Sequence, residues 1–184
     1  MIIYIHGFGS SGFGGKATIF KKQYGNILCS PSLSYVPTLA INTLEQLIEI
    51  SLANKQEVNL IGSSLGGFYA LYLANKYELK AVLINPSIFP YKTLDKIGLS
   101  TNYFDMSSFE VTPAHIESLK QYEVEMINNE KRFMVLLQKE DEVLNYKEAI
   151  LRLPKSHLHV EEGGSHSFDG VERYFERIEN FFKN

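Results

Sequence analysis

The chain has 184 residues, of which 45% are hydrophobic and 21% charged, a size and composition that suit one domain with a sizeable buried core. Lys and Arg together number 18 and Asp and Glu 21, so the formal net charge is only −3. This near balance argues against a surface built to bind nucleic acid or an anionic membrane, because both need clustered positive charge.

Cysteine content and apolar runs bear on the compartment. A single cysteine, Cys29, rules out an intramolecular disulfide, and its short apolar surroundings predict a buried, inert thiol. The apolar start Met1–Ile5 is interrupted by His6 and has no basic residue before it, unlike a signal peptide. No apolar run reaches the length that crosses a bilayer. We therefore expect a cytoplasmic protein with no membrane and no nucleic-acid partner.

Apolar runs alternate with amphipathic stretches along most of the chain. In order, the first half predicts a strand at Ile2–Ile5, a helix at Lys16–Tyr24, a strand at Ile27–Ser30, a helix at Pro37–Ala53, a strand at Glu57–Ile61 and a helix at Leu65–Tyr77. The second half predicts strands at Lys80–Ile84, Arg132–Leu137 and His157–Val160, and helices at Glu142–Leu153 and Phe168–Phe182. This alternation predicts an α/β fold with a mostly parallel sheet of about six strands, covered by helices on both faces.

One segment breaks the alternation. About residues 86–130 separate the fourth and fifth predicted strands without a clear strand of their own, far beyond a usual connection length. The segment is rich in aromatic residues, and we expect short helices there that form a small cap. Because no repeat, linker or low-complexity tract interrupts the chain, residues 1–184 are expected to form a single domain.

A short glycine-flanked motif points to a nucleophile. Gly62-Ser63-Ser64-Leu65-Gly66 matches the G-x-S-x-G pattern, with a predicted strand before it and a predicted helix after it. A tight strand-to-helix turn needs glycine on either side of the serine, since a Cβ there would clash with neighbouring backbone. The turn lifts the serine Oγ above the carboxyl edge of the sheet, at a helix N-terminus. The motif thus predicts Ser64 as a nucleophile, against the alternative of an ordinary Gly/Ser turn.

A serine hydroxyl needs a base to take its proton, and the base needs an acid to orient it. His166 lies in a glycine-rich loop between the last predicted strand and the last helix, where it can reach the sheet edge. The acid is expected after the fifth strand, in the run Glu140, Asp141, Glu142. Asp141 is the predicted acid, because a packed segment begins directly after it, and Glu140 and Glu142 stay open as alternatives.

The loop after the first strand is the candidate oxyanion hole. His6–Gly9 occupies the position from which hydrolases of this type supply one backbone donor, the other coming from the residue after the nucleophile. We therefore predict the N–H groups of Phe8 and Leu65 as the two donors. A phosphate-binding loop is the rival interpretation, but Gly14–Ala17 lacks the Ser or Thr that must follow its lysine.

Several stretches resemble the YqiA/YcfP-like small esterases, a compact family of α/β hydrolases. They run from the first strand to the last helix: Tyr4–Phe8, Ile61–Ala70, Asn85-Pro86, Asp141–Tyr146 and Glu162–Phe168. The resemblance implies a compact α/β-hydrolase fold and esterase or thioesterase activity, with Ser64 as nucleophile, Asp141 as acid and His166 as base. The chain departs from the family at Glu140, where glycine is usual, and at Asn145, where the family has a second aspartate.

The predicted function is therefore a serine hydrolase that cleaves a small-molecule acyl ester or thioester through an acyl-enzyme intermediate. This chemistry requires no metal and no organic cofactor. Three aromatic residues, Phe8, Phe13 and Phe68, are candidates for lining the acyl pocket, with core packing as the competing role of each. Two other functions remain open: acyl transfer or peptide hydrolysis by the same triad, and a non-catalytic ligand-binding protein that keeps the fold.

Overall fold

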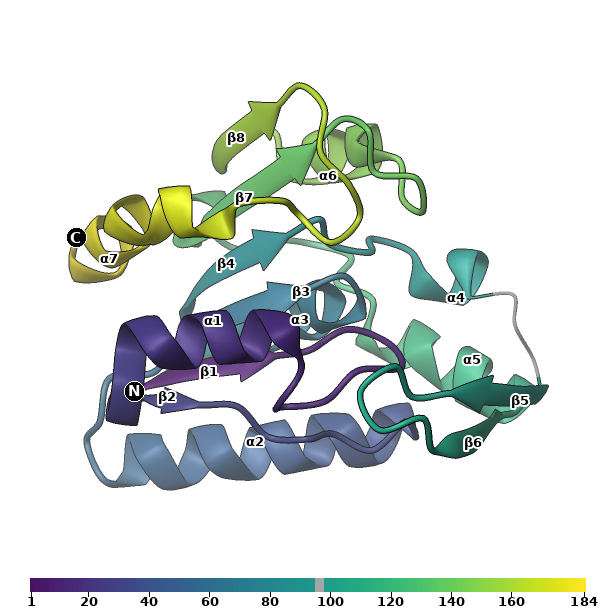
Figure 1. The fold of residues 1–184 in the computed structure, drawn as a ribbon. Helices are drawn as coiled ribbons and strands as arrows, with labels where there is room; N and C mark the ends of the chain where they lie inside the picture. The colour runs from purple at the N-terminus through teal and green to yellow at the C-terminus, as the bar shows by residue number, and fades with distance from the viewer. Residues whose placement is uncertain (95–97) are drawn as a thin grey trace.

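The apolar runs of the sequence pair into one six-stranded sheet with the strand order β2-β1-β3-β4-β7-β8. The computed structural model describes residues 1–94 and 98–184. The strands are β1 (Ile2–Ile5), β2 (Leu28–Cys29), β3 (Asn59–Ser63), β4 (Lys80–Ile84), β7 (Phe133–Gln138) and β8 (His157–Glu161). Each neighbouring pair in this sheet is parallel, so the carboxyl ends of the strands share one edge (Figure 1). The predicted fold class is confirmed.

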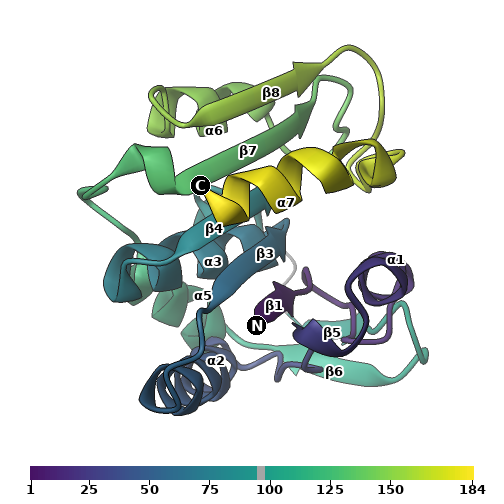
Figure 2. The same ribbon diagram turned by 90° about the vertical axis from the view of Figure 1, so that its left-hand side faces the viewer.

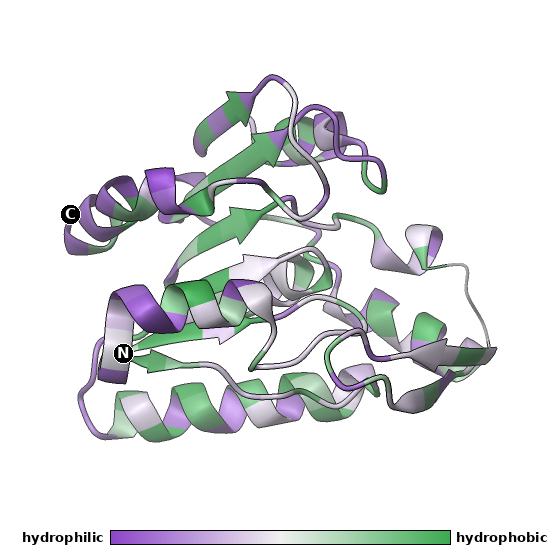
Figure 3. Cartoon of the chain, in the orientation of Figure 1, coloured by the Kyte–Doolittle hydropathy of each residue, from purple (hydrophilic) through white to green (hydrophobic). Residues whose placement is uncertain are grey.

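Alternation of side chains along each strand divides the core in two. In β1, Ile3 and Ile5 pack with α2 (Pro37–Ala53) and α3 (Leu65–Tyr77), whereas Ile2 and Tyr4 pack with α1 (Gly15–Tyr24) and α7 (Phe175–Lys183). Figure 2 shows α1 and α7 on one side of the sheet and α2 and α3 on the other. Figure 3 shows hydrophobic residues concentrated along the strands that the helices cover.

The acid-rich turn after β7 alters one predicted helix. The helix expected over Glu142–Leu153 is shorter and begins at Tyr146 as α6 (Tyr146–Arg152). The Asp141 carboxylate accepts hydrogen bonds from the N–H groups of Val143 and Leu144, at 2.9 and 2.8 Å. These bonds hold the intervening residues as a turn rather than as helix.

The segment between β4 and β7 differs from the prediction. Short helices are present as expected, α4 (Pro90–Thr93) and α5 (Pro113–Leu119), but so is an antiparallel hairpin of β5 (Gly98–Thr101) and β6 (Ser108–Val111). Residues 95–97 of the predicted cap lie outside the described residues. The hairpin escapes prediction because its strands are four residues long and the pair buries few apolar side chains, chiefly Phe109 and Val111.

The hairpin packs on the loop that follows β1. The N–H of Tyr103 donates to the carbonyl of Gly9 at 2.7 Å, and the rings of Phe8 and Phe109 meet edge to face at 5.5 Å. The segment thus forms one wall beside the carboxyl edge of the sheet. Over residues 1–94 and 98–184, no helix has the length and apolarity to cross a bilayer.

Candidate active site

Ser64 stands in the tight turn between β3 and α3, with φ 56° and ψ −121°. This conformation favours glycine, and holding a serine in it costs roughly 1–3 kcal/mol. The flanking glycines make the turn possible. A Cβ on Gly62 would lie 2.2 Å from the carbonyl oxygen of Gly66, and one on Gly66 would lie 2.0 Å from that of Ile5. The motif therefore reflects backbone contacts that no larger residue allows.

A chain of hydrogen bonds links Ser64 to a histidine and a carboxylate. His166 Nε2 lies 2.9 Å from Ser64 Oγ, and its Nδ1 lies 2.9 Å from both carboxylate oxygens of Asp141. With Asp141 ionised, the neutral imidazole donates from Nδ1 and accepts the serine proton at Nε2. The three side chains come from loops after β3, β7 and β8, at the same sheet edge.

Asp141 is strongly enclosed. Its side chain is only 2% exposed. Burial alone would raise the pKa of this carboxyl, but hydrogen bonds from the His166 ring and from the N–H groups of Leu144 and Val143 bring it below its ordinary value. The carboxylate is therefore ionised at neutral pH and holds the imidazole in one tautomer.

The two alternative candidates for the acid, Glu140 and Glu142, are not hydrogen-bonded to the His166 ring. The carboxylate of Glu142 accepts from the backbone N–H of His166 at 2.9 Å, and Glu140 is exposed. Of the three candidates, it is Asp141 whose carboxylate is hydrogen-bonded to the His166 ring.

Two buried amides hold the loop that carries His166. Asn85 donates to the carbonyls of Ser165 and His166, at 2.9 and 3.3 Å, and accepts from the N–H of Gln138 at 3.0 Å. Gln138 Oε1 accepts from the N–H groups of Ser165 and Asp169, at 3.1 and 2.8 Å. Both amides are 2% exposed. The sequence analysis assigns neither residue a role, although Asn85 stands in a stretch that resembles the family, and a polar residue at the end of an apolar strand, as at β4 and β7, is a usable signal.

Replacing Gln138 by leucine is expected to lower the free energy of unfolding by about 2–4 kcal/mol, because the N–H groups of Ser165 and Asp169 lose a buried acceptor. Amide hydrogen exchange across residues 162–170 should accelerate more than exchange in β3 and β4. Urea unfolding and exchange mass spectrometry measure both effects. The exposed Glu140→Gln serves as the control, with an expected change within about 0.5 kcal/mol. Unaltered exchange across residues 162–170 in the Gln138→Leu variant would show that Gln138 does not position the loop that carries His166.

The loop after β1 lies against the nucleophile. A Cβ on Gly7 would be 3.2 Å from Ser64 Cβ, a tighter contact than side chains ordinarily make. The buried ring of His6 fixes this loop: Nδ1 lies 2.8 Å from the Gly7 carbonyl and Nε2 accepts from the N–H of Leu33 at 2.9 Å. Burial lowers the pKa of His6, which keeps the ring neutral and suited to both bonds.

Of the two residues predicted to supply the oxyanion hole, Leu65 directly follows Ser64 and Phe8 lines the same cleft as Ser64. Among the described residues, neither the N–H of Phe8 nor that of Leu65 donates to a protein acceptor. Leu65 is the first residue of α3, where N–H groups have no intrahelical partner. Both N–H groups are thus without a protein acceptor among the described residues.

The predicted aromatic lining is partly wrong. Phe8 does line the cleft that contains Ser64 and His166, which has a volume of about 590 Å³. Phe68 does not, because it is 2% exposed and packs in the core on the α2–α3 side of the sheet. Phe13 is 71% exposed and lines a separate groove along α1, stacked on Phe104.

A mostly parallel sheet with a strand–serine–helix turn at its carboxyl edge defines the α/β-hydrolase fold, and solved structures of that fold match nearly the whole chain. A putative hydrolase from Agrobacterium vitis matches with a TM-score of 0.74 and 16% identity, covering 98% of this chain and 87% of that one. The mouse alpha/beta hydrolase domain-containing protein 10 matches with a TM-score of 0.71 and 14% identity, covering 99% of this chain and 89% of that one. A monoacylglycerol lipase from Paleococcus ferrophilus matches with a TM-score of 0.70 and 13% identity, covering 99% of this chain and 93% of that one. At these identities the likeness concerns the fold.

Comparisons of sequence identify the family to which the chain belongs. The model of the family described as Uncharacterised protein family (UPF0227) matches residues 1–183, and the chain belongs to this family. A relative, the UPF0227 protein YcfP of Escherichia coli, is 29% identical over 150 residues, covering 79% of this chain and 77% of that protein. The resemblance inferred from the motifs is thereby confirmed at the level of family.

Proposed function

We propose that this protein is a serine hydrolase that cleaves acyl esters or thioesters, with Ser64 as nucleophile, His166 as base and Asp141 as acid. One observation carries the proposal: His166 is hydrogen-bonded at 2.9 Å to Ser64 Oγ by one ring nitrogen and at 2.9 Å to Asp141 by the other. This geometry is that of a nucleophile, a base and an orienting carboxylate.

The proposed reaction has two halves. In the first, His166 Nε2 takes the Ser64 proton as Oγ attacks the acyl carbonyl carbon, and the N–H groups of Phe8 and Leu65 donate to the resulting oxyanion. His166 then gives the proton to the departing alcohol or thiol as the carbonyl reforms. In the second, water loses a proton to His166 and attacks the acyl-enzyme, which releases the acid and restores Ser64.

The contact between Ser64 and His166 favours catalysis over ligand binding without turnover, because binding alone does not need a base 2.9 Å from the serine hydroxyl. The strained turn, with φ 56° and ψ −121°, marks Ser64 as part of a functional site. The cleft also fits this chemistry, because Ser64 and His166 are both exposed to it. The monoacylglycerol lipase that shares the fold is named for cleavage of an acyl ester, which agrees with the proposed bond.

A fluorophosphonate probe tests the proposal directly, because it phosphonylates a serine that a histidine activates. We expect the wild-type protein to gain one adduct, located at Ser64 by peptide mass spectrometry. Ser63→Ala is the matched control, one residue away, and should still be labelled, whereas Ser64→Ala should not. A correctly folded wild-type protein that stays unlabelled at Ser64 would refute the proposal. Turnover of short-chain nitrophenyl esters against acyl thioesters then distinguishes the two substrate classes.

A further inference from the structure

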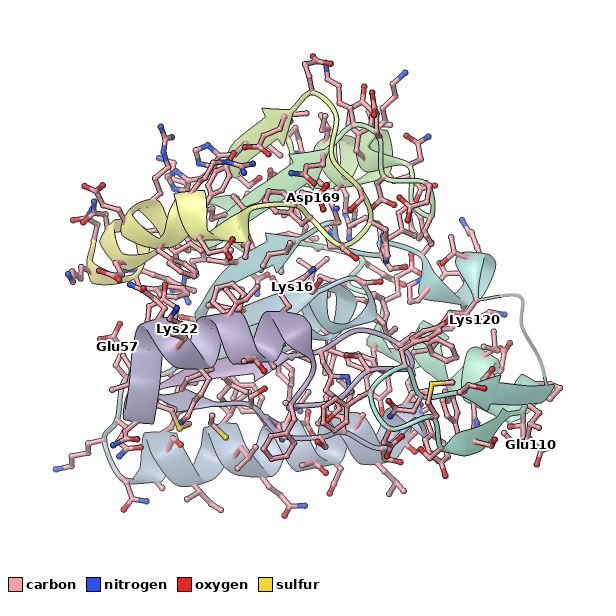
Figure 4. The ribbon with its side chains drawn as sticks, viewed as in Figure 1. Lys16, Lys22, Glu57, Glu110, Lys120 and Asp169 are labelled. Atoms are coloured by element: carbon pink, nitrogen blue, oxygen red, sulfur yellow. The ribbon has the colours of Figure 1, made fainter. Side chains whose placement is uncertain are left out.

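Lys16 is a cation in the cleft that the proposed triad does not use. It lies in the first turn of α1 and lines the same cleft as Ser64 and His166. Its ammonium donates to the hydroxyl of Ser63, the residue before the nucleophile, at 2.8 Å. Figure 4 shows Lys16 on α1, below the loop after β8 that carries Asp169.

The ammonium of Lys16 has no counterion in contact. Within residues 1–94 and 98–184, none of the ion pairs formed within 4.0 Å includes this residue. Burial lowers the pKa of Lys16 and the charges of Asp141 and Asp169 partly oppose this, so that the pKa lies at about 8 and the side chain is mostly cationic at neutral pH. A partly desolvated cation with neutral contacts alone is costly, and an anionic ligand group would offset that cost.

Two acidic residues, Asp169 and Glu172, also line the cleft, on the segment after β8. Asp169 already accepts a hydrogen bond from the hydroxyl of Ser165 at 2.9 Å. These carboxylates repel a negative group, so an anion in the cleft needs a cation to pair with, and Lys16 is the one lysine or arginine among the described residues that line it.

The position of His166 indicates which part of the substrate lies near Lys16. In serine hydrolysis the histidine protonates the leaving group, which must therefore lie on the histidine side of the nucleophile. His166 and Lys16 line the same cleft. The leaving group that His166 protonates and the ammonium of Lys16 therefore share this cleft.

We propose that Lys16 binds an anionic group, a carboxylate or a phosphate, carried by the leaving alcohol or thiol of the substrate. The inference rests on the proposed hydrolase function and adds the chemical class of the leaving group. Lys16 is in this sense a specificity residue: its ammonium pairs with the anion while its bond to Ser63 fixes its direction.

Matched substrate pairs test the inference. One pair is monobutyrylglycerol and monobutyrylglycerol phosphate, and the other is ethyl butyrate and butyryloxyacetate, so each pair differs by one anionic group on the leaving alcohol. The measured quantity is the ratio of kcat/KM for the anionic member to that for its neutral partner. In Lys16→Met, which keeps the aliphatic stem, we expect this ratio to fall roughly 30-fold for at least one pair. Lys16→Arg should keep most of the preference.

Lys22→Met is the matched control, because Lys22 is an exposed lysine on the same helix and does not line the cleft (Figure 4). Its substrate ratios should equal those of the wild type. Fluorophosphonate labelling separates the two proposals. If Ser64 is labelled in Lys16→Met but both ratios are unchanged, the anion-binding role is wrong and the hydrolase stands. An equal loss on anionic and neutral esters would likewise overturn the anion-binding role. If Ser64 is unlabelled in the wild type, the hydrolase proposal itself fails.

Discussion

Replacing Ser64 by alanine is expected to lower kcat for a short-chain nitrophenyl ester by about 10⁵- to 10⁶-fold, because the attacking atom is lost. The proposed backbone donors, the N–H groups of Phe8 and Leu65, remain, so a small residual acceleration over the uncatalysed reaction is expected. Steady-state kinetics on protein purified away from host esterases measures the effect. Activity within tenfold of the wild type would show that Ser64 is not the nucleophile.

Glycine at the same position separates reactivity from backbone strain. Ser64→Gly should be as inactive as Ser64→Ala, yet about 1 kcal/mol more stable, since glycine tolerates φ 56° and ψ −121° whereas alanine keeps the Cβ. The expected gain is a net value, because glycine also raises the entropy of the unfolded chain. Urea unfolding of the two inactive variants gives the difference. A glycine variant less stable than the alanine variant would mean that the turn is not strained.

The central strands of the sheet could be predicted because they are buried on both faces and are therefore mostly apolar. Strands such as Lys80–Ile84 match the expected bounds, and burial of Ala81 to Ile84 explains why the run is apolar. The hairpin β5–β6 could not be found in this way. It forms a two-stranded sheet of its own, with alternate side chains exposed, and Leu99 is 81% exposed. Its position depends on packing against the loop after β1, which no local pattern encodes.

In the candidate site, too, some residues could be predicted from the sequence and others could not. Ser64 has a local motif, and parallel topology brings the loops after β7 and β8, with Asp141 and His166, to the same sheet edge. The supporting polar residues have no such signature. Gln138 and Asn85 are 53 residues apart, and Lys16 and Ser63 are 47 apart. Contacts over such separations follow from the order of strands in the sheet, which the sequence periodicity does not fix.

The acid is the part of the proposed triad that most needs an experiment, because three acidic residues adjoin one another in sequence. Asp141→Asn is expected to lower kcat by about 10³- to 10⁴-fold, since an amide facing His166 Nδ1 as a donor imposes the tautomer that cannot accept the Ser64 proton. The remaining amide oxygen can still accept from the turn. Glu140→Gln, at the exposed neighbour, is the control and should keep kcat within about threefold. Full activity in Asp141→Asn together with loss in Glu140→Gln would show that the assignment is wrong.

The same variant should also change how stability depends on pH. Because the pKa of Asp141 is lower in the folded protein than its ordinary value, the ionised carboxylate contributes stability that is complete above about pH 4. That contribution is lost as the pH falls through the lowered pKa. Asp141→Asn has no such ionisation, so the gap in free energy of unfolding between wild type and variant should narrow below about pH 4. Urea unfolding at a series of pH values measures the gap, and a gap that stays constant into acid would mean that the Asp141 carboxyl is not stabilised as an anion.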